Sequence, residues 1–230
     1  VAQAEEAQPL QGGEYFAVTP ERIFDSRPGQ PDEGAAPKGR RAINPGSEFA
    51  VRVAGLGGVP GDANDILAVA LNVTVVDPSA KGWLGIRPSG TPRPAPDEQT
   101  SIVNYDPRRN VPNTTIVGVG SDGSVVLTLG PAKSASAHVT VDVFGWISTS
   151  GYDERTSEEG AGLVPHGPAR LVDTRAQNQP LTAGRSRPVQ VTGAALPGEE
   201  PVPNGATAVL VNLAVVNNAR GSSNLSTFVS

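Results

Sequence analysis

The chain has 230 residues, a formal net charge of −5 and no cysteine. The acidic balance argues against a nucleic-acid partner, which requires a basic patch to neutralise phosphates, and the lack of cysteine excludes disulfides and thiolate chemistry. No run of about 18 apolar residues is present, so we expect no transmembrane segment. The 27 glycines and 22 prolines favour many short strands separated by turns.

The first 13 residues are small, polar and acidic, and we expect them to form a disordered leader. They are similar to the mature start that remains after a signal peptide is removed. The absence of cysteine is compatible with export.

Strand-like segments follow, each short, alternating in polarity and bounded by Gly or Pro turns. They are Tyr15–Val18, Arg22–Ser26, Glu48–Ala54, Ile66–Val76, Trp83–Arg87, Ser101–Tyr105, Thr114–Val119, Val125–Leu129 and Ala137–Ile147. The SDG turn at residues 121–123 predicts a hairpin between the strands on either side of it. Strands at this spacing without helices predict one complete all-β repeat over residues 14–148, either an antiparallel β-sandwich of jelly-roll-like type or a barrel.

The most strongly patterned segment is Ile66–Val76, ILAVALNVTVV. Leu67, Val69, Leu71, Val73 and Val75 share one parity, and the other parity is also mostly apolar. The pattern predicts a central strand of the sheet.

Residues 149–162 are polar and acidic and predict a linker, after which the pattern begins again. RLVDTR at residues 170–175 repeats RIFDSR at residues 22–27, and TAVLVNLAVV at 207–216 repeats the central strand. We therefore expect a tandem repeat whose second copy, residues 163–230, is incomplete because it lacks counterparts of the strands after about Thr91. Half a sandwich exposes an apolar face, so either the chain belongs to a longer protein or the second copy packs elsewhere, including on another protein chain in an oligomer or larger assembly.

These blocks resemble a repeat found in secreted and cell-surface proteins of actinobacteria, whose pattern runs RLLDTR, GVP, AVALNVTV and HVVVDVVGYF. The matching residues are Arg22–Arg27, Gly58–Pro60, Ala68–Val75 and His138–Trp146. The resemblance covers nearly all of the first copy and the first half of the second. It implies an appended module of exported proteins and assigns no activity.

The D-S/T-R triplets carry the most chemically suggestive residues, Asp25 and Arg27 in the first copy and Asp173 and Arg175 in the second. In a strand, residues two apart point to the same side, so each pair can join one polar network. A ligand or metal site is one interpretation, but the recurrence in both copies favours a framework role. Asn72 and Asn212 lie among apolar neighbours in the two central strands, where we expect each amide to satisfy loop backbone, for example at the GVP turn.

Trp83, Tyr105 and Trp146 are the candidates for stacking on a sugar, although core packing is the ordinary role of such residues in strands. Asp62, Asp65 and Asp77 are of a type that calcium binds, but their spacing matches no calcium loop and predicts turn formation. We expect no metal and no cofactor.

No nucleophile, base or metal constellation of a known kind is present. His138 and Asp142 are four residues apart on one strand face, roughly 13 Å at the rise of a strand, and too far for a direct acid–base pair. The sequence therefore predicts a non-catalytic extracellular binding or structural module. Its predicted function is adhesion or the binding of a cell-wall or extracellular polysaccharide. The alternative is an accessory domain of an exported hydrolase whose catalytic domain lies outside this chain.

Overall fold

The computed structural model describes residues 13–28, 42–44, 46–95, 100–130, 136–149, 152, 160–162, 170–182, 184–194, 201–211 and 213. The chain divides into two compact units, Val1–Gly162 and Leu163–Ser230. Residues 1–12 of the expected leader and most of the expected linker lie outside the described residues.

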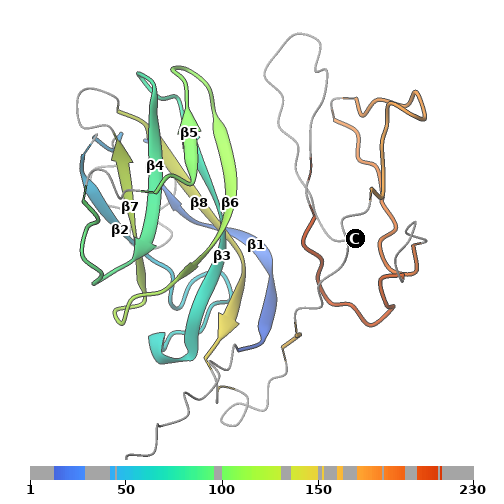
Figure 1. Cartoon of the computed structure of the whole chain (residues 1–230), viewed down its shortest axis with the longest axis horizontal. Coiled ribbons are helices and arrows are strands. Elements are labelled where there is room, and N and C mark those ends of the chain that lie inside the picture. The colour runs from blue at the N-terminus through green and yellow to red at the C-terminus, as the bar shows by residue number, and fades with distance from the viewer. Residues whose placement is uncertain are drawn as a thin grey trace, which may run out of the picture. The chain divides into compact units, whose positions relative to one another are not determined.

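The described secondary structure of the first unit consists of strands and one short 3-10 helix (Figure 1). The strands are β1 (Tyr15–Asp25), β2 (Glu48–Arg52), β3 (Ile66–Val76), β4 (Gly82–Pro88), β5 (Val103–Tyr105), β6 (Val111–Gly118), β7 (Ser124–Gly130) and β8 (His138–Ser148), and the helix η1 is Ala63–Asp65. No helix within the described ranges is long and apolar enough to cross a membrane.

The strands form two four-stranded antiparallel sheets, in the orders β1-β8-β3-β6 and β2-β7-β4-β5. The pairs β1–β8, β2–β7, β3–β6 and β4–β5 are those of one long hairpin with β1 to β4 on one arm and β5 to β8 on the other. Rolling such a hairpin into two layers produces a jelly-roll sandwich. The first unit is therefore an all-β sandwich, and the barrel alternative is wrong because its strands separate into two sheets.

The alternating pattern of the strands explains the core between the sheets. Val69, Leu71 and Val73 of β3 are fully buried, as are Leu84 of β4 and Leu127 of β7 in the other sheet. Burying each such side chain stabilises the fold by about 1.5–3 kcal/mol. The sandwich forms because every strand directs one row of apolar residues to this layer.

Ile66–Val76 forms the expected central strand, with β8 on one side and β6 on the other. One detail of its pattern is wrong: Leu67 is exposed, although Val69, Leu71 and Val73 on the same parity are fully buried. The pairing with β8 is irregular between Ile66 and Ala68, and such an irregularity shifts side chains relative to the sheet faces.

Two other expectations about the strands are corrected. Tyr15–Val18 and Arg22–Ser26 belong to one strand, β1, whose pairing with β8 is interrupted by a bulge between Ala17 and Glu21. The SDG turn does not make a hairpin, because β6 pairs with β3 whereas β7 pairs with β2 and β4. The turn at residues 121–123 instead carries the chain from one sheet to the other.

In the second unit, no described residue lies in a helix or strand. The strand expected at residues 207–216 is not formed over residues 207–211 and 213, where Val209, Leu210, Val211 and Leu213 are exposed. The corresponding strand β3 of the first unit has its backbone groups paired on both sides. No such neighbours occur among the described residues of the second unit.

Candidate functional site

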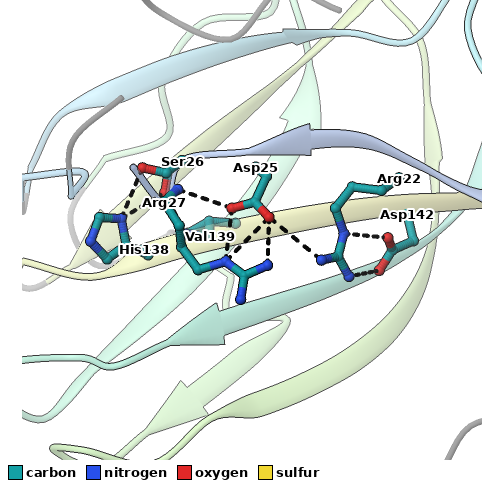
Figure 2. A network of polar contacts seen from close by, with 7 residues as sticks. All are labelled: Arg22, Asp25, Ser26, Arg27, His138, Val139 and Asp142. Atoms are coloured by element: carbon teal, nitrogen blue, oxygen red, sulfur yellow. Dashed lines mark hydrogen bonds and ion pairs between the residues drawn. The ribbon is translucent and has the colours of Figure 1, made fainter. Parts of the chain in front are cut away.

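The first candidate site is a polar network on the outer face of the β1-β8-β3-β6 sheet, shown in Figure 2. Asp25, at the end of β1, accepts hydrogen bonds from the backbone N–H of Arg27 at 2.9 Å and from Arg27 Nη2 at 2.6 Å. Its side chain is only 6% exposed. The aspartate therefore fixes the turn that follows β1 and orients the arginine at the same time.

A second ion pair continues the network across the sheet. Arg22 Nε donates to Asp142 Oδ1 at 2.8 Å and Arg22 Nη2 donates to Asp142 Oδ2 at 3.2 Å, which makes a bidentate pair (Figure 2). Arg22 Nη1 also lies 3.5 Å from Asp25 Oδ2. Because Arg22 is on β1 and Asp142 on β8, this pair joins two neighbouring strands.

Ser26 and His138 complete the network at its other end. Ser26 is fully buried; it accepts a hydrogen bond from the Val139 N–H at 2.8 Å, and its carbonyl oxygen lies 2.9 Å from His138 Nδ1. A hydroxyl without exposure cannot reach a substrate, so Ser26 and His138 hold the chain after β1 against β8. Asp142 pairs with Arg22, so His138 and Asp142 make no acid–base pair, as their spacing predicts.

The electrostatics of the network favour its charged form. Burial opposes ionisation of Asp25, but the hydrogen bonds from Arg27 outweigh it and lower the pKa of Asp25 below its usual value. The hydrogen bond to Asp25 likewise raises the pKa of Arg27, against the smaller opposing effect of burial. All of the carboxylate oxygens are thus engaged with cations, and the arrangement is that of a framework.

The second unit repeats this cluster locally. Asp173 accepts from the Arg175 N–H at 3.0 Å and from Arg175 Nη2 at 2.6 Å, and Arg170 Nη1 lies 3.0 Å from Asp173 Oδ2. Hydrogen bonds from Arg175 hold the pKa of Asp173 well below its usual range. Because all the partners lie within six residues, the R-x-x-D-x-R sequence forms the cluster without a sheet.

Asn72 does not make the expected hydrogen bonds to loop backbone among the described residues. Its side chain is half-buried on the outer sheet face, where Asn72 pairs in register with Asp142 on β8 and Thr114 on β6. Within the described part of the chain its amide makes no side-chain hydrogen bond. Asn212, its counterpart in the second copy, lies outside the described residues.

The three aromatic candidates are in different environments. Tyr105 and Trp146 are buried, and the ring of Trp146 is covered by Phe16, stacked at 4.3 Å between ring centres, and by the edge of Tyr152. Burial also raises the pKa of Tyr105, whose hydroxyl lacks a hydrogen-bond partner among the described residues. Neither ring offers an open face for stacking on a sugar, because both are packed in the core.

Trp83 remains as an accessible aromatic residue. It alternates with the buried Leu84 on β4, so its half-buried indole lies on the outer face of the β2-β7-β4-β5 sheet. A Cβ atom placed on Gly130 would be 2.2 Å from the indole Cζ2, and one placed on Gly85 would be 3.3 Å from Cζ3. The indole therefore rests on the backbone of two neighbouring strands, β4 and β7. A side chain at residue 130 would overlap the indole, whereas one at residue 85 would touch the indole and overlap the Thr100 carbonyl oxygen.

Charged side chains surround the Trp83 face. Arg87 Nη2 forms an ion pair with Glu48 Oε2 at 2.9 Å, and Arg93 Nε lies 3.5 Å from Glu48 Oε1. Arg87 Nη1 is buried without a hydrogen-bond partner in the described part of the protein. A hollow of about 40 Å³, large enough for a few water molecules, lies here. Its lining is Trp83, Ile86, Arg87, Arg93, Pro94, Thr100 and Thr128.

Another hollow, of about 440 Å³, opens near the bulge of β1. Its lining is Phe16, Ala17, Val18, Gly55, Gly58, Val59, Pro60, Trp146 and Tyr152. Of its three aromatic residues, Trp146 and Tyr152 are almost fully buried, whereas Phe16 is half-buried. The lining also includes glycine backbone and the side chains of Val18, Val59 and Pro60, and no charged side chain is among the described lining residues.

Metal ligands do not gather within the described ranges, where no group of three or more His, Asp or Glu side chains is placed to hold an ion. Asp62 caps helix η1 by accepting from the Asn64 N–H at 2.9 Å, and Asp77 adopts a positive φ of 46° in a turn. These two residues have the turn roles that their sequence predicts.

Several residues of these sites were not singled out by the sequence. Arg22 had a usable signal, since Arg170 repeats it three residues before the second aspartate. Glu48, Arg87 and Arg93 come from different segments and share no local pattern, so only the fold brings them together.

The sequence matches no protein-family model and no curated protein. Among solved structures, the chain is similar to the coat protein of Tobacco streak virus, with a TM-score of 0.30 and 10% sequence identity. The match covers 70% of this chain and 95% of the coat protein. The strand order and register described above define the fold independently of this similarity.

Proposed function

We propose that the protein is a non-catalytic binding module of an exported or cell-surface protein, and that it binds an extracellular polysaccharide at the Trp83 face. The observation that carries the proposal is the half-buried indole of Trp83, held against Gly85 and Gly130 on an outer sheet face. A ring fixed in this way loses little conformational freedom when a pyranose stacks on it.

The polar groups around the ring support the same assignment. Arg87, Glu48 and Thr128 lie beside Trp83 and provide both donors and acceptors for hydroxyl groups. The hollow here is small, which suits one substituent of a sugar ring better than a whole buried ligand. The resemblance to the actinobacterial repeat agrees with an exported module.

The test is binding of the whole chain to a panel of cell-wall and plant polysaccharides, measured by affinity electrophoresis and calorimetry. Trp83→Ala is expected to reduce binding about tenfold or more, because stacking on an aromatic ring is lost. Arg52→Ala, on β2 of the same sheet, is the control and should bind like the unaltered protein. Thermal melts verify that each variant is folded.

The absence of binding to every polysaccharide would refute the proposal, as would equal binding by Trp83→Ala and the unaltered protein.

A further inference from the structure

Strand β6 is an unusual sheet edge in this molecule. It is eight residues long and carries no charged side chain. The edge strand β1 contains Glu21, Arg22 and Asp25, β2 contains Glu48 and Arg52, and β5 has three residues. Sheet edges usually carry charges or are short, because an open edge is a template for another strand. Among the described edges, β6 has neither form of protection, and its one residue that blocks pairing is Pro112, the second residue of the strand.

The backbone groups that face the open side of β6 can be assigned from the pairing. Antiparallel pairs alternate between those that exchange both hydrogen bonds and those that exchange none. Because Pro112 has no N–H, its pair with Thr74 is one of those that exchange no hydrogen bonds. No irregularity interrupts the pairing of β3 with β6, so the alternation continues along the strand. Thr114 and Ile116 have the same parity as Pro112, so their N–H and C=O groups point away from β3.

The other neighbour of β3 gives the same assignment. Ser26 N–H donates to the Val139 carbonyl at 3.0 Å, so Val139 directs its backbone groups to the β1 side of β8. Asp142, of the opposite parity, therefore directs its groups to β3, where it pairs with Asn72. Asn72 thus bonds to β8, and its partner on β6, Thr114, is left with its groups at the open edge.

A segment with the complementary pattern is present in the second unit. Residues 207–213 repeat residues 67–73 of β3, the strand that β6 already binds on its other side. Among the described members of this segment, Leu210 is 75% exposed and Val211 46% exposed, and none lies in a strand. The segment has no charged residue that would oppose pairing with β6.

We propose that residues 207–213 of one copy of the chain add to the open edge of β6 in a second copy, as an antiparallel strand. Thr114 and Ile116 would each contribute one N–H and one C=O to the new pairing. Val209, Val211 and Leu213 would extend the inner apolar layer beside Val117, and Leu210 would contact Ile116, which is 53% exposed, on the outer face.

The experiment is sedimentation of the full chain over a range of concentrations, with amide hydrogen exchange at Thr114 and Ile116. The unaltered protein is expected to associate, and protection of these two amides should rise with concentration. Thr114→Pro removes an edge N–H without affecting the bonds to β3, and Ile116→Lys places a charge on the edge. Each is expected to weaken association about tenfold or more, and so is Val211→Lys.

Leu181→Lys is the matched control, because Leu181 belongs to the second unit, lies outside the segment and is also 46% exposed. It should associate like the unaltered protein, and thermal melts should show all variants folded. A monomer at every concentration would overturn the proposal, including a monomer whose Thr114 and Ile116 amides are protected by its own second unit. Unchanged association in both Thr114→Pro and Ile116→Lys, or equal weakening in Leu181→Lys, would also overturn it.

Discussion

Replacing Asp25 with alanine is expected to lower the free energy of unfolding of the first unit by about 2 kcal/mol. The Asp25 side chain is 6% exposed and receives hydrogen bonds from the backbone, Nε and Nη2 of Arg27. Breaking a fully buried ion pair costs about 3–5 kcal/mol. The side chains of Arg27 and Arg22 are 36% and 44% exposed, so water can solvate them after the change, which reduces the cost.

The assay is urea unfolding followed by tryptophan fluorescence, since Trp83 and Trp146 both lie in strands of the first unit. The midpoint should fall without a change in slope. Asp173→Ala is the matched control: it removes the same local contacts in a cluster outside any described strand, and it should leave this transition unchanged. A midpoint for Asp25→Ala equal to that of Asp173→Ala would refute the framework role of Asp25.

Three further predictions concern pH, the Trp83 face and the core. Because the pKa of Asp25 is lower in the folded state than in the unfolded state, ionised Asp25 should stabilise the fold fully above about pH 4, and this stabilisation should disappear as the pH falls further. Asp25→Asn should lack this pH dependence in unfolding curves taken from about pH 6 to about pH 2. Gly130→Ala should displace the Trp83 indole, seen as altered fluorescence in a Trp146→Phe background, and weaken polysaccharide binding; an unmoved ring would contradict the packing described here. Leu71→Ala should cost about 2–5 kcal/mol in urea unfolding, and a loss below 1 kcal/mol would mean that β3 is not central to the core.

Most strand positions could be predicted from the sequence, because the alternation of apolar and polar residues marks where a strand lies. The alternation in Ile66–Val76 gives the bounds of β3, and the segments predicted around Trp83 and Val125 differ from β4 and β7 by one residue at each end. Which strands pair with one another was harder to predict from the sequence. The SDG turn has hairpin chemistry, yet its two strands join different sheets, because the choice of partner depends on residues far away in the chain.

The candidate sites divide in the same way. The Asp25–Arg27 and Asp173–Arg175 contacts follow from a two-residue spacing and recur in both units. The Arg22–Asp142 pair joins residues 120 positions apart and has no local signature. The aromatic residues share a strand context in the sequence, but only packing separates the accessible Trp83 from the buried Tyr105 and Trp146.

The sequence by itself determined that the protein is built of short strands and that the R-x-x-D-x-R cluster forms, because both depend on interactions within a few residues. The tertiary structure decided which strands share a sheet, which face of each strand meets water, and that β6 lies at an open edge. These features depend on the burial of apolar side chains from distant segments against one another, and no short stretch of sequence contains that information.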